Sequence, residues 1–353
     1  MAEPQPDHYD IGWICALGTE LTASRLFFNS IYEAKLPLAE NDSNTYVRGR
    51  MGEHNVVIAV LPVGSTGTNA AATTTNNIVR SYRNLKVVLM VGIGGGAPTV
   101  KNDIRLGDVV ISAKSGQYGA VMQYDLGRQH QGRGFEPTGF LSLPPTSIST
   151  VANVVKSNHD LDKTNSLTTK IDAALATRSK LRWIYGRPGE ATDVLFKSDY
   201  VHVGHDTCDD CDTTQAVRRR VRDDDEQGPQ AHYGLIASAN LVMRDAKFRD
   251  TLAKEKGVLC FEMEAAGMMN NCPCLVIRGI CDYSDSHKNK QWQGYAAMVA
   301  AAYAKELLLQ LEPQEMARDQ TIAQALTDGQ LLITQHKSHF VFFLTIEIQY
   351  QML

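Results

Sequence analysis

The sequence predicts an α/β fold with a largely parallel or mixed central sheet. Two observations lead to this fold class. Apolar, β-branched runs of strand length recur along the chain between turn residues, with little alternation of apolar and polar positions. Helix-like stretches separate several of these runs. Strands that are buried on both faces and alternate with helices are typical of a sheet covered by helices.

The expected elements follow in chain order. Seven segments are expected to form strands, namely 10–17, 55–63, 85–94, 107–112, 233–238, 257–263 and 274–282. Helices are expected after the second, sixth and seventh strands, at 66–82, 265–271 and 292–312. The last helix carries apolar residues on one face, as helices that pack on a core do.

Two regions differ from this pattern. Residues 115–232 are polar and rich in glycine, proline and charge, so long loops around a single helix at 148–157 are expected. Within them, the run RRRVRDDDE at 218–226 carries both charge signs, which favours a solvated loop over a polyanion site. The tail after Pro313 begins as a polar helix. Its apolar end, 339–353, is too short to span a membrane and is either an extra strand or a weakly ordered appendage.

Composition excludes several classes of function. The 353 residues are 43% hydrophobic and 21% charged, as in ordinary soluble domains. A net charge of -4 offers no basic surface for nucleic acid. The polar, acidic first ten residues are unlike a signal or transit peptide, and no apolar run is long enough for a membrane span. Seven cysteines in so long a chain do not form a disulfide framework, so a reducing, cytoplasmic setting is expected.

A glycine cluster, VGIGGGAP at 91–98, follows the third expected strand. It satisfies the loose pattern G-x-G-x-x-[GA], but a dinucleotide site would need a helix to open there, and Pro98 leads to another strand instead. The Gly-Lys-Ser/Thr of a phosphate loop is absent. Gly94 and Gly95 are therefore expected to let a ligand approach the backbone at a strand's carboxyl end. The alternative is a tight turn only.

The stretch FEMEAAGMM at 261–269 places Glu262 and Glu264 around Met263, where a strand runs into a helix. Charged side chains rarely enter a core unless they are paired or used.

Several segments together resemble one family, the purine nucleoside phosphorylase and nucleosidase superfamily. They are the IGWICALGTEL stretch, the glycine cluster with its following GDVVIS strand, EMEAAG and VIRGICDYSD. The resemblance covers roughly residues 8–312, with a loop-rich insertion at 115–232 and a separate tail at 313–353. Within the superfamily the chain is most similar to methylthioadenosine/S-adenosylhomocysteine nucleosidases and to related fungal domains, often found N-terminal to a NACHT module. The resemblance implies a single α/β domain built on a mixed, partly barrel-like sheet flanked by helices. It also implies a homo-oligomer, with a dimer favoured, and no cofactor.

The resemblance assigns roles to the acidic motif. Met263 would pack against the ribose, and Glu264 would accept hydrogen bonds from the 2′- and 3′-hydroxyls and stabilise positive charge on the sugar. Glu262, two residues back, is assigned to the same binding site. The alternative for Glu264 is a salt-bridged carboxylate of the core.

The resemblance also implies the chemistry of cleavage. Asp282 would act as general acid at purine N7, and an aspartate there is compatible with 6-aminopurines. Glu20, in the loop after the first strand, would activate water, with Arg278 near that water. The arginines that bind phosphate in phosphorylases are absent from the matching segments, which favours water as the nucleophile. The nucleosidases have a serine in the glycine loop, where this chain has Ile93 or Gly94.

At the expected 5′ end of the nucleoside pocket, the residues differ from those of the nucleosidases. Thr66 stands where the nucleosidases have an aliphatic residue, and it would suit a 5′-hydroxyl. Trp292 falls where the family has an aromatic side chain near the 5′ substituent. The ring that stacks on the base falls near Val242, so another ring such as Tyr283 could replace it.

One segment offers metal ligands outside this family pattern. HVGHDTCDDC contains His202, His205, Cys208 and Cys211, and C-x-x-C with two histidines matches zinc. Four ligands in ten residues strain the geometry, so a surface loop without metal is favoured, with structural zinc or a redox pair as alternatives.

The sequence thus predicts a purine ribonucleoside N-ribosyl hydrolase that releases free base and ribose, with adenosine-type substrates favoured. The expected partner is a small-molecule purine nucleoside, without nucleic acid or membrane. The alternatives are a purine nucleoside phosphorylase and a nucleoside-sensing domain of a fungal signalling protein. The set of Glu20, Glu264 and Asp282 favours an enzyme, because binding alone would not need all three.

Overall fold

A computed structural model describes residues 3–116, 118–132, 134–138, 141–162, 164–223, 226–269, 271–316 and 319–328. Its strands are β1 (Ile11–Cys15), β2 (Ser30–Tyr32), β3 (Tyr46–Met51), β4 (His54–Val60), β5 (Val87–Gly96), β6 (Val109–Ser112), β7 (Val121–Gln123), β8 (Gly127–His130), β9 (Gly134–Pro137), β10 (Ala231–Ser238), β11 (Val258–Glu262) and β12 (Leu275–Asp282). Its helices are α1 (Gly18–Arg25), α2 (Thr68–Ser81), α3 (Thr146–Leu161), α4 (Ser166–Leu175), α5 (Ser179–Tyr185), α6 (Ala246–Lys256), α7 (Ala265–Met269), α8 (Gln293–Gln310) and α9 (Pro313–Met316).

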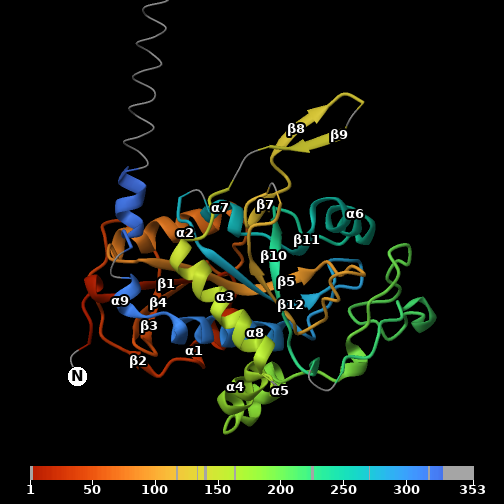
Figure 1. Ribbon diagram of the computed structural model, residues 1–353, viewed down its shortest axis with the longest axis horizontal. Coiled ribbons are helices and arrows are strands. Elements are labelled where there is room, and N and C mark those ends of the chain that lie inside the picture. The colour runs from red at the N-terminus through yellow and green to blue at the C-terminus, as the bar shows by residue number, and fades with distance from the viewer. Residues whose placement is uncertain are drawn as a thin grey trace, which may run out of the picture.

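The central sheet closes on itself to form a five-stranded barrel (Figure 1). Strand β5 pairs parallel with β12, β12 antiparallel with β6, β6 parallel with β10, and β10 parallel with β11. Strand β11 then pairs antiparallel with β5 and completes the barrel. From β5 the sheet continues outward through β1, β4, β3 and β2. The expected mixed, partly barrel-like α/β fold is confirmed.

Helix α8 supplies the centre of the core. All residues from 294 to 304 are buried, although the sequence suggested a helix with one apolar face. Alanines make up much of this stretch, and their small side chains let neighbouring elements approach the helix on several sides. Helices α3, α4 and α5 pack against α8, as do strands β5 and β12 (Figure 1).

The seven expected strands and four expected helices are present, with ends shifted by a few residues. Of the expectation for 115–232, the long loops are present, mainly between α5 and β10, but the single helix was wrong. This region adds α4 and α5 beside α3, and the hairpin of β8 and β9, which projects from the body in Figure 1. The run at 218–226 is not wholly solvated either. Arg222 is half-buried, and it donates to Oδ1 of the fully buried Asp108 at 2.9 Å.

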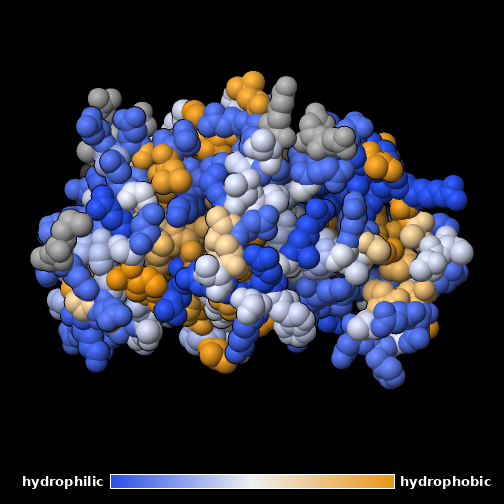
Figure 2. Space-filling model, turned by 90° about the horizontal axis from the view of Figure 1, so that it is seen from below, coloured by the Kyte–Doolittle hydropathy of each residue, from blue (hydrophilic) through white to orange (hydrophobic). Residues whose placement is uncertain are grey.

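The start of the tail packs on the domain. Met316 and Ile322 are buried, and the Ile322 amide donates to the Leu85 carbonyl oxygen at 2.8 Å. The expectation for 339–353 lies outside the described residues. No helix in the described part of the chain has both the length and the apolarity needed to cross a membrane. The face seen in Figure 2 is mostly hydrophilic, with apolar side chains in small separate groups.

Candidate active site

The carboxyl ends of β5, β11 and β12 meet the start of α1 around one cavity of about 250 Å³. Strand register explains this convergence. In the β5–β12 pair Arg278 lies opposite Gly92, and in the β5–β11 pair Phe261 lies opposite Gly95. The residues predicted from the sequence that line the cavity are Glu20, Thr66, Gly94, Gly95, Val242, Glu262, Met263 and Glu264.

Arg278 is the hub of the acidic cluster. Its side chain is fully buried in β12, and its guanidinium forms an ion pair with Glu262. Nη2 also lies 3.3 Å from Glu264 Oε2, and Nη1 lies 3.9 Å from Glu20 Oε1. One buried cation thus faces three buried carboxylates. This arrangement leaves an excess of negative charge at the edge of the cavity when all three are ionised.

Protonation of the cluster follows from this charge balance. Burial raises the pKa of Glu264 to about 7, Arg278 opposes the shift, and the carboxylates of Glu262 and Glu20 reinforce it. Burial also raises the pKa of Glu20, against the opposing effect of Arg278 and of backbone hydrogen bonds. A carboxyl group that titrates near neutrality can exchange a proton at physiological pH.

Glu20 is held by the backbone. It lies in the first turn of α1 and not in a loop as expected, and its Oε2 accepts hydrogen bonds from the amides of Ala16 at 2.7 Å and Leu17 at 2.9 Å. Its Oε1 accepts from the Ile93 amide at 2.8 Å. An ionised carboxylate has about four acceptor positions, so one remains for a water molecule.

Glycine at two positions in β5 makes this packing possible. A Cβ atom on Gly92 would overlap the Glu20 carboxylate and the Arg278 guanidinium. A Cβ atom on Gly95 would overlap Asp282 and Ser284. The glycine cluster therefore allows side chains of the site itself, as well as any ligand, to lie against the backbone of β5.

Asp282, the general acid implied by the family resemblance, has a charged partner. It is buried at the end of β12, and its Oδ2 lies 2.8 Å from the Lys288 Nζ. Its Oδ1 accepts a hydrogen bond from the Ser284 amide at 2.9 Å. The two side chains form an ion pair. Lys288 lines the cavity whereas Asp282 lies behind it, so the lysine is the more exposed member of the pair.

Two aromatic residues predicted from the sequence lie elsewhere. Trp292 does not line the cavity, because its ring is 1% exposed in the core and its Nε1 donates to Thr192 Oγ1 at 3.1 Å. Tyr283 points away to Asp193 and Arg219. The ring that does line the cavity is Phe261, and Gln293 lines it beside the position expected for Trp292.

Sequence reasoning missed Lys288, Phe261 and Ser284. Phe261 could have been found, since it precedes the Glu-Met-Glu motif on the same strand. Lys288 and Ser284 follow β12 in an irregular loop, where no periodicity tells which side chains face inward. Ser284 has a positive φ of 55°, and its buried hydroxyl has no hydrogen-bond partner in the described part of the chain. Backbone strain of this kind is concentrated at functional sites.

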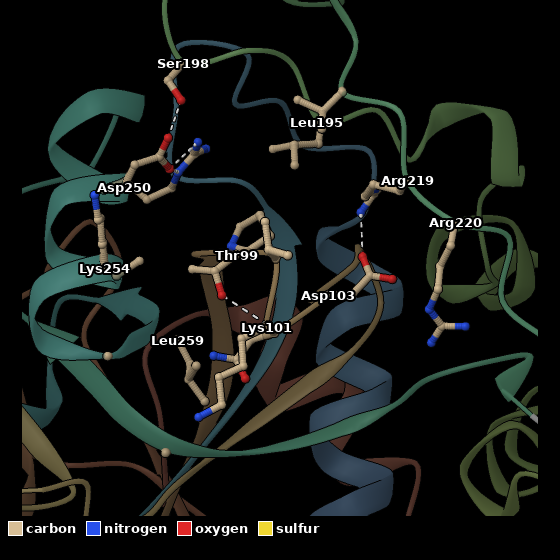
Figure 3. A pocket seen from close by; sticks show the side chains of 18 of the residues that line it. Thr99, Lys101, Asp103, Leu195, Ser198, Arg219, Arg220, Asp250, Lys254 and Leu259 are labelled. Carbon is tan, nitrogen blue, oxygen red and sulfur yellow. Dashed lines mark hydrogen bonds and ion pairs between the residues drawn. The ribbon is translucent and has the colours of Figure 1, made fainter.

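A second cavity, of about 1020 Å³, shares no lining residue with the first. Its walls carry Lys101, Arg219, Asp103, Lys254 and Asp250 (Figure 3). Arg219 is paired with Asp103 and Asp193, and Asp250 accepts a hydrogen bond from Ser198 and pairs with Arg249. The larger cavity thus has more basic than acidic side chains in its lining, and none of the clustered glutamates.

A carboxylate-rich cavity at the mouth of a mixed barrel, beside a glycine-rich strand end, defines an α/β protein of nucleosidase and phosphorylase type. A model of the phosphorylase superfamily matches residues 10–311, and the chain belongs to this superfamily. A nucleotide-binding leucine-rich repeat (NLR)-like protein of Hyaloscypha variabilis is 43% identical over 311 residues, which cover 88% of this chain and 30% of that protein. The chain therefore spans less than a third of that relative.

More distant relatives cover the domain at full length. A 5′-methylthioadenosine/S-adenosylhomocysteine nucleosidase of Mycobacterium bovis is 22% identical, over 84% of this chain and 95% of that protein. The corresponding nucleosidase of Neisseria meningitidis, solved with methylthio-immucillin-A, superposes with a TM-score of 0.55 at 16% identity, covering 86% and 99% of the two chains. Futalosine hydrolase of Helicobacter pylori gives a TM-score of 0.51 at 17% identity, covering 85% and 97%. These structures share the fold, and the resemblance seen in the sequence is confirmed.

Proposed function

We propose that the protein is a purine ribonucleoside N-ribosyl hydrolase, with adenosine-type substrates favoured. The observation that carries the proposal is the placement of Glu20 and Glu264 on one cavity around the buried Arg278, with Asp282 beside the same cavity. Cleavage of an N-glycosidic bond needs an anion near the sugar, a base for water and a proton donor for the leaving base. These three groups supply those functions.

In the proposed mechanism, Glu264 accepts hydrogen bonds from the ribose 2′- and 3′-hydroxyls and stabilises the oxocarbenium-like transition state. Glu20 takes the proton of the attacking water through its remaining acceptor position. Asp282, with its partner Lys288, protonates or hydrogen-bonds N7 of the base. Ser284 lines the cavity, and its unpartnered hydroxyl offers a further hydrogen bond to the base.

Electrostatics favour water over phosphate as the nucleophile. Phosphate carries about two negative charges and needs arginine, lysine or backbone donors. Among the described lining residues Lys288 is the one cation, and Asp282 already neutralises it. Arg278 is enclosed by three glutamates, which would repel a dianion. Incubating purified protein with adenosine, with and without phosphate, tests this choice: free ribose without phosphate supports hydrolysis, and ribose 1-phosphate would establish the phosphorylase instead.

A nucleoside-sensing domain is the second candidate, favoured by the match to part of an NLR-like protein. A sensor would bind a nucleoside without cleaving it. Base release from a panel of nucleosides, measured beside calorimetric binding, separates the two. Binding of a nucleoside that is never cleaved would establish the sensor.

A further inference from the structure

The loop at 202–211 gathers metal-binding side chains. A ring nitrogen of His202 and the Sγ atoms of Cys208 and Cys211 lie within 4.8 Å of one another. Ligand atoms around a tetrahedral zinc lie roughly 3.3–3.8 Å apart, as follows from Zn–S and Zn–N bonds of ~2.3 and ~2.0 Å. A small closure of this loop would therefore complete three coordination positions.

The orientation of His202 suits a metal ligand. Its Nε2 lies 2.9 Å from the carbonyl oxygen of Thr207. Donation of a proton to that carbonyl fixes the tautomer and leaves the Nδ1 lone pair available. Ligating histidines commonly donate their second ring nitrogen to a backbone carbonyl in this way.

His287 supplies the independent observation. It is 7% exposed, and neither of its ring nitrogens has a hydrogen-bond partner among the described residues, although Asp285 Oδ1 lies 3.7 Å from its Nδ1. Buried imidazole nitrogens are otherwise bonded. Its ring centroid lies 5.5 Å from that of His202, and two imidazoles on one tetrahedral zinc have centroids about 5 Å apart. Cys208 Sγ lies 3.7 Å from the His287 carbonyl oxygen, so the two loops already touch.

We propose that His202, Cys208, Cys211 and His287 form a structural zinc site. His205, the fourth ligand suggested by the sequence, is exposed. Neither His205 nor His287 belongs to the group of three whose ligand atoms lie within 4.8 Å of one another, so closure of the loop must also bring a ring nitrogen of the buried His287 to that group. Two thiolates with two imidazoles select zinc over calcium or magnesium, which prefer oxygen ligands. The metal joins the 202–211 loop to the loop after β12, which carries Lys288.

Zinc content of the purified full chain tests the proposal without any enzyme assay. Wild type and the matched control His205→Ala are expected to hold zinc at one ion per chain. Cys208→Ser, Cys211→Ser and His202→Ala should each bind zinc at least ~100-fold more weakly, since loss of a direct ligand exceeds the 10–100-fold effect of losing an outer partner. Equal zinc content in all variants, or loss of zinc in His205→Ala, would overturn the site.

Two measurements on the wild-type chain keep the proposal testable if a variant misfolds. X-ray absorption at the zinc edge should show two sulfur and two imidazole ligands at ~2.3 and ~2.0 Å. A single imidazole in that spectrum contradicts the assignment of His287. Mass spectrometry without reductant should find both thiols intact after the metal is chelated. A peptide containing both Cys208 and Cys211 that is lighter by two hydrogen atoms, in protein isolated without metal, would establish a Cys208–Cys211 disulfide and refute the zinc site.

Discussion

Burial and the neighbouring carboxylates of Glu262 and Glu20 raise the pKa of Glu264, and Arg278 lowers it. The resulting pKa is about 7. The proposed mechanism needs Glu264 ionised, so kcat/KM for adenosine should fall as the pH drops below about 7. The profile of kcat/KM reports the free enzyme, in which this pKa applies. In Glu264→Gln the residual activity should lose this limb near pH 7. If kcat/KM of the variant still falls below about pH 7, the titration belongs to another group.

Asp282 and Lys288 act as a pair, and removal of the carboxylate tests its role. Asp282→Asn should lower adenosine turnover by at least ~100-fold, the lower end of what general acid catalysis supplies. Binding of free adenine should weaken much less, because an amide still hydrogen-bonds the base. The measurement is kcat beside the dissociation constant for adenine. A variant that turns over at nearly the native rate would remove Asp282 from the mechanism.

Thr66 lines the cavity where the related nucleosidases have an aliphatic side chain. Its hydroxyl suits a 5′-hydroxyl, so adenosine should be cleaved with a kcat/KM at least equal to that for methylthioadenosine. Thr66→Val, which keeps the shape and removes the hydroxyl, should shift the ratio towards the methylthio compound. A tenfold or greater preference of wild type for methylthioadenosine would contradict this assignment.

Among single residues, the sequence predicted those that lie in motifs. Glu262, Met263 and Glu264 could be found because the EMEAAG stretch resembles a motif of the family, and all three line the cavity. Trp292 could not be placed, because an aromatic residue at a helix start can face the cavity or the core equally well. It faces the core, where Thr192 accepts its N–H.

Among the elements, β5 should tolerate substitution least. Gly92→Ala should abolish or strongly reduce activity, because its Cβ would push the Glu20 carboxylate from Arg278. Overpacking of a buried site costs typically 1–3 kcal/mol, so Tm should fall as well. Gly189→Ala is the matched control, since its φ of −59° suits alanine and nothing lies within 4 Å of the added carbon. Native activity in Gly92→Ala would show that the tight packing around Glu20 is dispensable.

The elements that the sequence revealed are those with long apolar runs, such as β5 and β12. Short elements could not be predicted, because a few residues give only a weak hydrophobic pattern. Helix α1 has eight residues, and its clearest sign is Glu20 in the first turn, where it reaches back to the Leu17 amide. The hairpin of β8 and β9 is exposed and polar, so it lacks the alternation that marks a half-buried strand.

For the whole molecule, barrel closure is what brings distant motifs together. Strand β11 pairs with β5 across more than 150 residues of sequence and places the Glu-Met-Glu motif against the glycine cluster. Pairing over such distances follows from the resemblance to a family and not from local pattern. The homo-oligomer expected from that resemblance stays a prediction, as does the role of the domain within a longer NLR-like protein.

The whole proposal depends on water activation by Glu20. Glu20→Gln keeps the shape of the side chain and loses most of its basicity. It should bind nucleoside with nearly unchanged affinity and hydrolyse adenosine at least ~100-fold more slowly. Glu264→Gln should instead weaken binding as well as turnover, because it loses ribose contacts.

The decisive measurement pairs calorimetric binding with single-turnover cleavage of adenosine for wild type and both variants. The mechanism predicts that Glu20→Gln retains binding and loses cleavage. Cleavage by Glu20→Gln at the wild-type rate would contradict it and would place water activation at another group in the cavity.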